Sequence, residues 1–275
     1  MPLLNEEEIR RYSRQIIVPE FGVAGQMKLG KGKVLVVGAG GLGSPVALYL
    51  AAAGVGTIGL VDMDVVDLSN LQRQVIHGTG DVGRPKVESA AEKLRRLNPH
   101  VYVETHHVAF GPDNAMDLLA PYDVVVDAVD NFHARYLLHD ASYLAGKPLV
   151  EAGVLRFEGL MTTVVPRKGA CYRCVFPEPP PPGTIPTCQE AGIIGPIPGV
   201  MGTLQAMEVI KLLTGIGETL SGRLLIFDGL GASFREVAIA RNPKCPLCGE
   251  HPTIKDLSGH AAGWVCPPPA PPATP

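Results

Sequence analysis

The chain has 275 residues, of which 46% are hydrophobic and 19% are charged, and its formal net charge is −3. This composition is typical of a globular protein with a full core, and its charge balance gives no reason to expect a nucleic acid or an anionic membrane as partner. The acidic residues 6–8 lack the positive charge of a signal peptide, and no apolar run reaches the roughly 18–20 residues of a membrane span, so we expect neither.

The first predicted element is a helix over residues 5–17. Asn5 can cap its start, acids fill its first turn, and arginines follow, an order that suits the helix dipole. Two of these arginines, Arg10 and Arg11, are interpreted as part of a solvated face.

A glycine-rich turn follows a predicted buried strand over residues 34–37 and precedes an apolar helix. Gly38, Gly40 and Gly43 have the G-x-G-x-x-G spacing, which allows a tight turn, lets the backbone approach a phosphate and permits close packing of helix on strand. The start of the helix offers unpaired N–H groups and a positive dipole to an anion. We interpret this stretch as a nucleotide-binding loop, and a turn kept for packing alone is the alternative.

Two acids, Asp62 and Asp64, follow the next predicted strand, which covers residues 56–61. An acid about 20 residues after the glycine loop binds a ribose hydroxyl in dinucleotide-binding folds. The position of Asp62 therefore favours a nucleotide with an unphosphorylated adenosine ribose.

A predicted helix over about 85–97 has two cations, Arg84 and Lys86, at its start. A cation is disfavoured at this positive end of a helix by about 0.3–1 kcal/mol, and a bound polyanion would remove that cost. Lys86 is therefore interpreted as a phosphate ligand, with a solvated lysine as the alternative.

Asp130 and Asn131 lie where the predicted strand over residues 123–130 gives way to a helix. Ligands of open α/β sheets lie beyond the carboxyl ends of the parallel strands, so Asp130 should share one rim of the sheet with Asp62. We interpret Asp130 as a Mg²⁺ ligand, and the alternative is that it caps the following helix.

Strands and helices alternate in the first half of the chain, whereas strands of the second half follow one another with one helix between them. This order predicts an α/β fold, a Rossmann-like doubly wound, mostly parallel sheet that antiparallel strands extend. The remaining predicted strands cover 101–105, 148–154, 159–165, 222–228 and 234–239, and the remaining helices cover about 131–145 and 200–213. We expect a single domain over 1–250, with a nucleotide-binding half at about 30–155, a β extension at 156–250, a loop at 176–199, and a Pro-rich, disordered tail over 251–275.

Two C-x-x-C pairs, Cys171 with Cys174 and Cys245 with Cys248, lie about 70 residues apart. Together they can present four thiolates to one tetrahedral zinc ion, and such a closed site is structural, not catalytic. Two disulfides or a redox-active pair are the alternatives, although neither pair lies in a thioredoxin-like pattern. Because cysteines without a secretory signal indicate a reducing, cytoplasmic compartment, zinc is the favoured interpretation.

A further cysteine, Cys188, follows a Pro-rich stretch over 177–186 that cannot form a helix or an inner strand. A lone thiol on such an exposed loop is a candidate nucleophile, and an idle cysteine is the alternative. Cys266 lies in the Pro-rich tail and is interpreted as idle.

These motifs, together and in this order, resemble the E1-like, MoeB/ThiF-type adenylyltransferases of ubiquitin-like sulfur carrier proteins (the HesA/MoeB/ThiF family). The resemblance covers about residues 5–250. It rests on the glycine loop, the two cysteine pairs, Asp62-x-Asp64, Ser69–Gln74, Gly83-x-Pro85-Lys86, Asp130-Asn131, Thr187-Cys188 and Gln205–Glu208.

The resemblance implies that the C-terminal Gly-Gly carboxylate of a carrier attacks the α-phosphorus of MgATP, giving an acyl-adenylate and pyrophosphate. It implies a homodimer in which Arg14 reaches the partner's ATP, Mg²⁺ at Asp130, structural zinc at the four paired cysteines, and a covalent link to the carrier at Cys188. Sulfur from a donor such as a cysteine desulfurase or rhodanese would then serve molybdopterin, thiamin or tRNA thiolation. The implied nucleotide-binding residues are Gly38, Gly40, Gly41, Gly43, Asp62, Asp64, Ser69, Asn70, Leu71, Gln72, Arg73, Lys86, Asp130 and Asn131, and the implied catalytic residues are Arg14, Arg73, Lys86, Asp130 and Cys188.

A carboxylate that attacks a polyphosphate brings two anions together, so the reaction needs positioning and neutralising charge more than a base. Arg73, Lys86 and Mg²⁺ at Asp130 would supply that charge. A dinucleotide-dependent oxidoreductase fits the glycine loop and Asp62 but leaves the cations and the zinc cysteines unexplained. A catalytically silent scaffold that docks a ubiquitin-like partner should have lost a phosphate ligand, and none of those named is missing.

Overall fold

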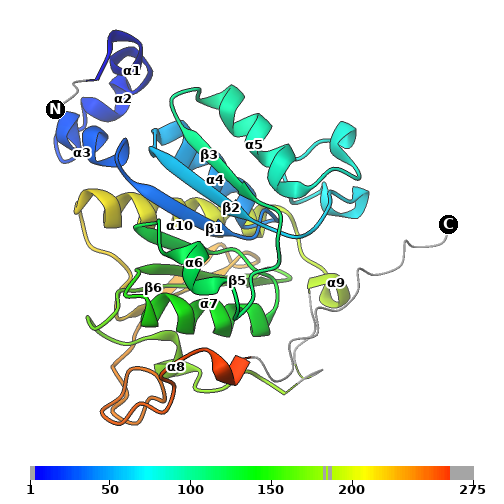
Figure 1. Cartoon of the computed structure of the whole chain (residues 1–275), viewed down its shortest axis with the longest axis vertical. Helices are drawn as coiled ribbons and strands as arrows, with labels where there is room; N and C mark the ends of the chain where they lie inside the picture. Colours follow the sequence, from blue (N-terminus) through cyan, green and yellow to red (C-terminus); the bar gives the residue numbers. More distant parts are fainter. Residues whose placement is uncertain (1–3, 182–183, 185–187, 261–275) are drawn as a thin grey trace.

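The computed structural model describes residues 4–181, 184 and 188–260. Within them, one eight-stranded sheet has the strand order β3-β2-β1-β4-β5-β6-β7-β8 (Figure 1). The strands from β3 to β5 in this order pair in parallel, and those from β5 to β8 pair antiparallel, which confirms the predicted fold class. The strands are β1 (Lys33–Val37), β2 (Thr57–Val61), β3 (Tyr102–His106), β4 (Val124–Asp127), β5 (Leu149–Leu155), β6 (Glu158–Val164), β7 (Arg223–Asp228) and β8 (Ser233–Ala238).

Helices cover both faces of the parallel half of the sheet, so its strands are continuous apolar runs and not alternating ones. On β1, Val34 and Val36 pack in one core with α4, α5 and α10, and Leu35 and Val37 pack in a second core with α6 and α7. The helices are α1 (Glu6–Arg11), α2 (Ser13–Ile16), α3 (Gly22–Leu29), α4 (Gly43–Ala53), α5 (Lys86–Leu97), α6 (Ala115–Leu119), α7 (Phe132–Leu144), α8 (Tyr172–Val175), α9 (Cys188–Ala191) and α10 (Pro196–Thr214).

The N-terminal region differs from the predicted single helix over 5–17. Asn5 caps α1 as expected, but Tyr12 separates α1 from α2. The Tyr12 side chain is buried, and its hydroxyl accepts a hydrogen bond from Asn98 Nδ2 at 2.8 Å. This tertiary anchor turns the chain where local propensity alone would continue the helix. The next helix, α3, was not predicted, because its glycines are weak helix formers.

Residues 251–260 belong to the folded domain, although the sequence placed its end at 250. Leu257 packs in the second core, and His260 Nε2 lies 2.7 Å from Asp140 Oδ2 on α7. The rest of the predicted tail, with Cys266, lies outside the described residues. In the described part of the chain, no helix is long and apolar enough to span a membrane.

Candidate functional site

The glycine loop joins β1 to α4, and the physical reason for a glycine differs from one position of the loop to the next. Gly38 has a φ of 104°, and a Cβ there would lie 2.4 Å from the Ala128 carbonyl oxygen. A Cβ on Gly43 would lie 1.9 Å from the Gly38 oxygen. At Gly40, in contrast, a Cβ would meet only Gln74, whose Nε2 is 3.5 Å away. Packing therefore explains Gly38 and Gly43, whereas a Cβ on Gly40 would make only an ordinary contact with Gln74, so packing does not require a glycine there.

Asp62, at the end of β2, ties the glycine loop to the rim of the sheet. Its Oδ2 accepts a hydrogen bond from the Ala39 N–H, and its Oδ1 accepts one from the Asp64 N–H, each at 2.8 Å. Burial raises the pKa of the Asp62 carboxyl, and the positive charge of Lys86 opposes that shift. Each carboxylate oxygen keeps a second lone pair, so Asp62 can still accept a hydrogen bond from a ribose hydroxyl.

Lys86 is the first residue of α5, and its side chain is only 7% exposed, which excludes the alternative of a solvated lysine. Its Nζ lies 2.7 Å from Asp64 Oδ2. The Asp64 carboxylate thus offsets the unfavourable charge at the helix start, a role that the sequence argument had given to a bound polyanion. The ammonium lies on the same rim as Asp62, whose titration it influences.

The segment between β2 and α5 brings Arg73 beside the glycine loop. A 3-10 turn over Leu68–Asn70 opens this segment, and Arg73 Nη1 donates to the Ser69 carbonyl oxygen at 3.2 Å. The Cβ position of Gly41 lies 3.6 Å from Arg73 Cγ. The Arg73 guanidinium forms no ion pair within the described ranges, so its charge is available to an anion.

Asp130 lies just beyond β4, and β4 and β2 flank β1 on its two sides. The Asp130 side chain is exposed and has neither a hydrogen bond nor an ion pair among the residues that the structure describes. The next residue, Asn131, caps α7 by accepting a hydrogen bond from the Ala134 N–H at 2.8 Å. The capping alternative for Asp130 is therefore wrong, and its carboxylate is available as an oxygen ligand.

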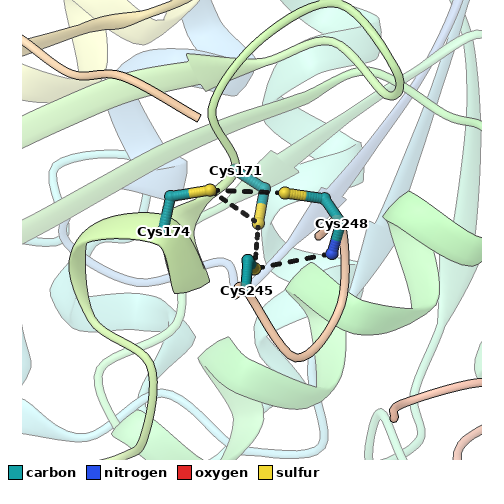
Figure 2. A group of neighbouring side chains, drawn as sticks. All are labelled: Cys171, Cys174, Cys245 and Cys248. Carbon is teal, nitrogen blue, oxygen red and sulfur yellow. Dashed lines mark hydrogen bonds between the residues drawn. The ribbon is translucent and has the colours of Figure 1, made fainter. Parts of the chain in front are cut away.

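The four paired cysteines converge near the start of α8 (Figure 2). Their sulfur atoms lie within 4.8 Å of one another, with Sγ–Sγ distances of 3.5 Å for Cys171–Cys245 and 3.3 Å for Cys174–Cys248. Sulfur ligands at 2.3 Å from a tetrahedral zinc ion would be about 3.8 Å apart, whereas a disulfide requires about 2.05 Å. The Asn242 N–H also donates to Cys174 Sγ at 3.3 Å. The cluster fits a zinc ion, not two disulfides.

Two predicted site residues, Arg14 and Cys188, are not brought by any described contact to the edge of the sheet beside the glycine loop. Arg14 is exposed on α2, and its guanidinium has no partner in the described part of its own chain. Cys188 is the first residue of α9, but its side chain and residues 182–183 and 185–187 lie outside the described set. The chain after α9 returns to the rim, because a Cβ on Gly195 would lie 2.3 Å from the Gln72 carbonyl oxygen.

Sequence reasoning missed a group of buried charges between the sheet and α7. Asp127 on β4 pairs with Arg135 at 2.7 Å, and Glu151 on β5 lies 3.2 Å from His139 Nδ1. Burial raises the pKa of the Glu151 carboxyl, and the nearby His139 opposes that shift. The sequence does carry a signal for these pairs, since Asp127 ends one apolar strand and Glu151 lies within another. A buried charge needs a partner, so each acid indicates a partner on a neighbouring element.

Comparisons with known proteins agree with this geometry. The model of the ThiF family matches residues 12–247. A Thermus thermophilus protein named sulfur carrier protein adenylyltransferase is 51% identical over 262 residues, which cover 94% of this chain and 97% of that protein. The mouse protein named adenylyltransferase and sulfurtransferase MOCS3 is 53% identical over 260 residues, and the match covers only 56% of its length.

Solved structures give the same assignment of fold. The structure of E. coli MccB with MccA-N7isoASN superposes with a TM-score of 0.79 at 25% identity, covering 87% of this chain and 74% of that one. The glycine loop, the rim cations and three of the four clustered cysteines lie within the segment that the family model matches, and Cys248 follows directly after its last residue. The resemblance inferred from the motifs is thus confirmed, and the chain belongs to the ThiF family.

Proposed function

We propose that the protein adenylates the C-terminal Gly-Gly carboxylate of a ubiquitin-like sulfur carrier protein with ATP and releases pyrophosphate. The observation that carries the proposal is one rim where the glycine loop, the buried lysine Lys86 and Arg73, which forms no ion pair within the described ranges, meet. The relative of nearly equal length, 51% identical, bears the name of that activity. An oxidoreductase would not need these cations for its chemical step, since its cofactor reacts at the nicotinamide and not at phosphorus.

The side chains of the rim have separate tasks in this reaction. Asp62 holds the ribose, and Asn70, Arg73 and Lys86 bind the phosphates and neutralise the charge that opposes an attacking carboxylate. Asp130, whose carboxylate has no partner in the part of the chain that the structure describes, would hold Mg²⁺, a cation that prefers oxygen ligands and that would add charge neutralisation at the phosphates. Positioning and charge, not a general base, are what this chain supplies.

The four-cysteine cluster would hold zinc as a structural ion. Four thiolates leave no open coordination position, so the ion fastens the segment around Cys245 and Cys248 to α8 and takes no part in the chemistry. The reducing cytoplasm is the compartment in which such thiols stay available to a metal.

Three further steps complete the proposal. In a homodimer, Arg14 extends from one protomer to the ATP of its partner and adds a cation there. The Cys188 thiolate would then attack the carbonyl carbon of the acyl-adenylate, forming a thioester with the carrier and releasing AMP. A donor such as a cysteine desulfurase or rhodanese delivers the sulfur, for molybdopterin, thiamin or tRNA thiolation.

The test is ATP–pyrophosphate exchange with radiolabelled pyrophosphate, with and without candidate carriers that end in Gly-Gly. We expect exchange with a cognate carrier and none with the same carrier after deletion of its two terminal glycines. ATP binding without exchange for any carrier would favour the silent scaffold. Tight binding of a nicotinamide dinucleotide in place of ATP would favour the oxidoreductase.

A further inference from the structure

Arg135 on α7 joins the carboxyl end of β4, and the residue before Asp130, to the middle of the neighbouring strand β5. Its Nε donates to Asp127 Oδ2 at 2.7 Å, and its Nη2 donates to the carbonyl oxygens of Val129 at 3.2 Å and Ala152 at 2.8 Å. The Asp127 side chain is fully buried, and that of Arg135 is 11% exposed. One guanidinium therefore fixes the end of β4 and the residues after it against the middle of β5.

The end of β4 is also held from the opposite face of the sheet. Gln205 on α10 is fully buried, and its Nε2 donates to the carbonyl oxygens of Asp127 at 2.7 Å and Val150 at 3.1 Å. Asp127 Oδ1 also accepts a hydrogen bond from the Val129 N–H at 3.0 Å. The backbone is thus fixed up to the residue that precedes Asp130, whose own side chain is exposed and unpartnered among the described residues.

Stability alone does not explain this arrangement. Burial by itself would lower the pKa of the Arg135 guanidinium, but the Asp127 carboxylate beside it raises that pKa, so the guanidinium stays charged. A buried ion pair is often no more stable than well-packed apolar side chains of the same volume. What a guanidinium adds is a rigid fork that can donate to three fixed acceptors at once.

We propose that Arg135 is a positioning residue that sets the place of the Asp130 carboxylate for the magnesium ion of MgATP. The inference rests on the proposed function of Asp130. Magnesium demands near-ideal octahedral geometry, so a small displacement of one ligand weakens its binding. Residues behind a metal ligand change metal affinity by roughly 10–100-fold when they are replaced.

The test measures metal binding, not only turnover. Mn²⁺ accepts the same oxygen ligands as Mg²⁺, and its electron paramagnetic resonance signal separates free from bound ion. Full-length wild type and Arg135→Lys are titrated with Mn²⁺ in the presence of α,β-methylene-ATP. Lysine keeps the charge but cannot reach three acceptors. We expect the Mn²⁺ affinity to fall by roughly ten-fold or more, and the Mg²⁺ concentration for half-maximal pyrophosphate exchange to rise in parallel.

The matched control is Arg173→Lys. Arg173 makes a similar buried pair, with Asp140 further along α7, at 2.7 and 2.8 Å. We expect this variant to lose thermal stability while its Mn²⁺ affinity stays at the wild-type value. Equal loss of Mn²⁺ affinity in both variants, or unchanged affinity in Arg135→Lys, would overturn the inference.

Two further measurements keep the outcomes distinct. If Arg135→Lys does not fold, Asp127→Asn replaces it, because asparagine keeps the shape and should show a smaller shift in the same direction. Asp130→Asn tests the premise. If Asp130→Asn leaves Mn²⁺ affinity unchanged, the proposed role of Asp130 is wrong, whereas a loss in Asp130→Asn without one in Arg135→Lys rejects only the role of Arg135.

Discussion

The ammonium nitrogen of Lys86 lies 2.7 Å from Asp64 Oδ2, and the two side chains differ in exposure, at 7% and 58%. The Lys86 side chain is buried at the start of α5, whereas the Asp64 side chain faces solvent. Because Asp64 faces solvent, its carboxylate can move into water when a phosphate approaches. The phosphate would then replace it as the anionic partner of the buried ammonium.

Replacement of Lys86 by methionine should separate charge from packing. Lys86→Met keeps a long buried side chain, so we expect the melting temperature to stay within a few degrees of wild type while pyrophosphate exchange falls at least 100-fold, about 2.7 kcal/mol of lost transition-state stabilisation. Exchange assays and thermal denaturation measure the two effects. Arg84→Met is the control, since Arg84 is a more exposed cation at the same helix start that pairs with Asp81 and Glu92. Equal loss of exchange in both variants would count against a specific role for Lys86.

Two glycine-to-alanine variants should fail in different ways. Gly43→Ala places a Cβ 1.9 Å from the Gly38 oxygen, so the turn must distort and we expect a clear loss of thermal stability. Gly40→Ala meets only Gln74 Nε2, at 3.5 Å, so we expect normal stability and weaker ATP binding. Thermal denaturation and ATP titration measure the two variants side by side. Unchanged ATP affinity in Gly40→Ala would show that the space over Gly40 is not used by the nucleotide.

The cysteine cluster predicts one bound zinc ion whose loss destabilises the fold. Cys171 is fully buried, and Cys171→Ser should abolish stoichiometric zinc and lower the melting temperature by roughly 10 °C, as a loss of several kcal/mol would. Elemental analysis and thermal denaturation are the measurements, and Cys266→Ser is the control that should keep both values. A wild-type protein without zinc, or a Cys171→Ser variant that retains a full equivalent, contradicts the assignment.

The fold was predictable because each parallel strand is a short apolar run between turn residues, and because the glycine loop fixes which strand is central. The ion-pair partners of the buried charged side chains were not predictable from the sequence. Lys86 with Asp64, and Arg135 with Asp127, meet only after a strand and a helix pack together. Leu257 was assigned to the Pro-rich tail, yet it packs in the second core. Local pattern gives the elements, while pairing across elements is set by tertiary packing.

Cys188 should matter for sulfur transfer and not for adenylation. Cys188→Ala should keep wild-type pyrophosphate exchange with the cognate carrier, because the thiol would act only after the acyl-adenylate forms. Transfer of sulfur to the carrier should fall to background, measured by mass spectrometry of the carrier C-terminus. Cys266→Ala should leave both steps intact. Full sulfur transfer by Cys188→Ala would reduce Cys188 to an idle cysteine.

Asp81 provides a prediction on acid stability. Burial would raise the pKa of its carboxyl, but hydrogen bonds from Lys93 and the Gly78 N–H, with the charge of Lys93, lower it to about 2. Since this folded-state pKa is below the ordinary 3.8, the stabilisation is full above about pH 4 and is lost as the pH falls toward 2.

Asp81→Asn should accordingly reduce the free energy of unfolding at pH 7 by roughly 1–3 kcal/mol, and the difference from wild type should shrink steadily between pH 4 and pH 2. Thermal denaturation across this range measures it. Because acid would also release any zinc that the cysteine cluster holds in both proteins, the informative quantity is the difference between them and not the absolute stability. A difference that stays constant from pH 7 to pH 2 would mean that Asp81 stabilises the fold through its shape and not through its charge.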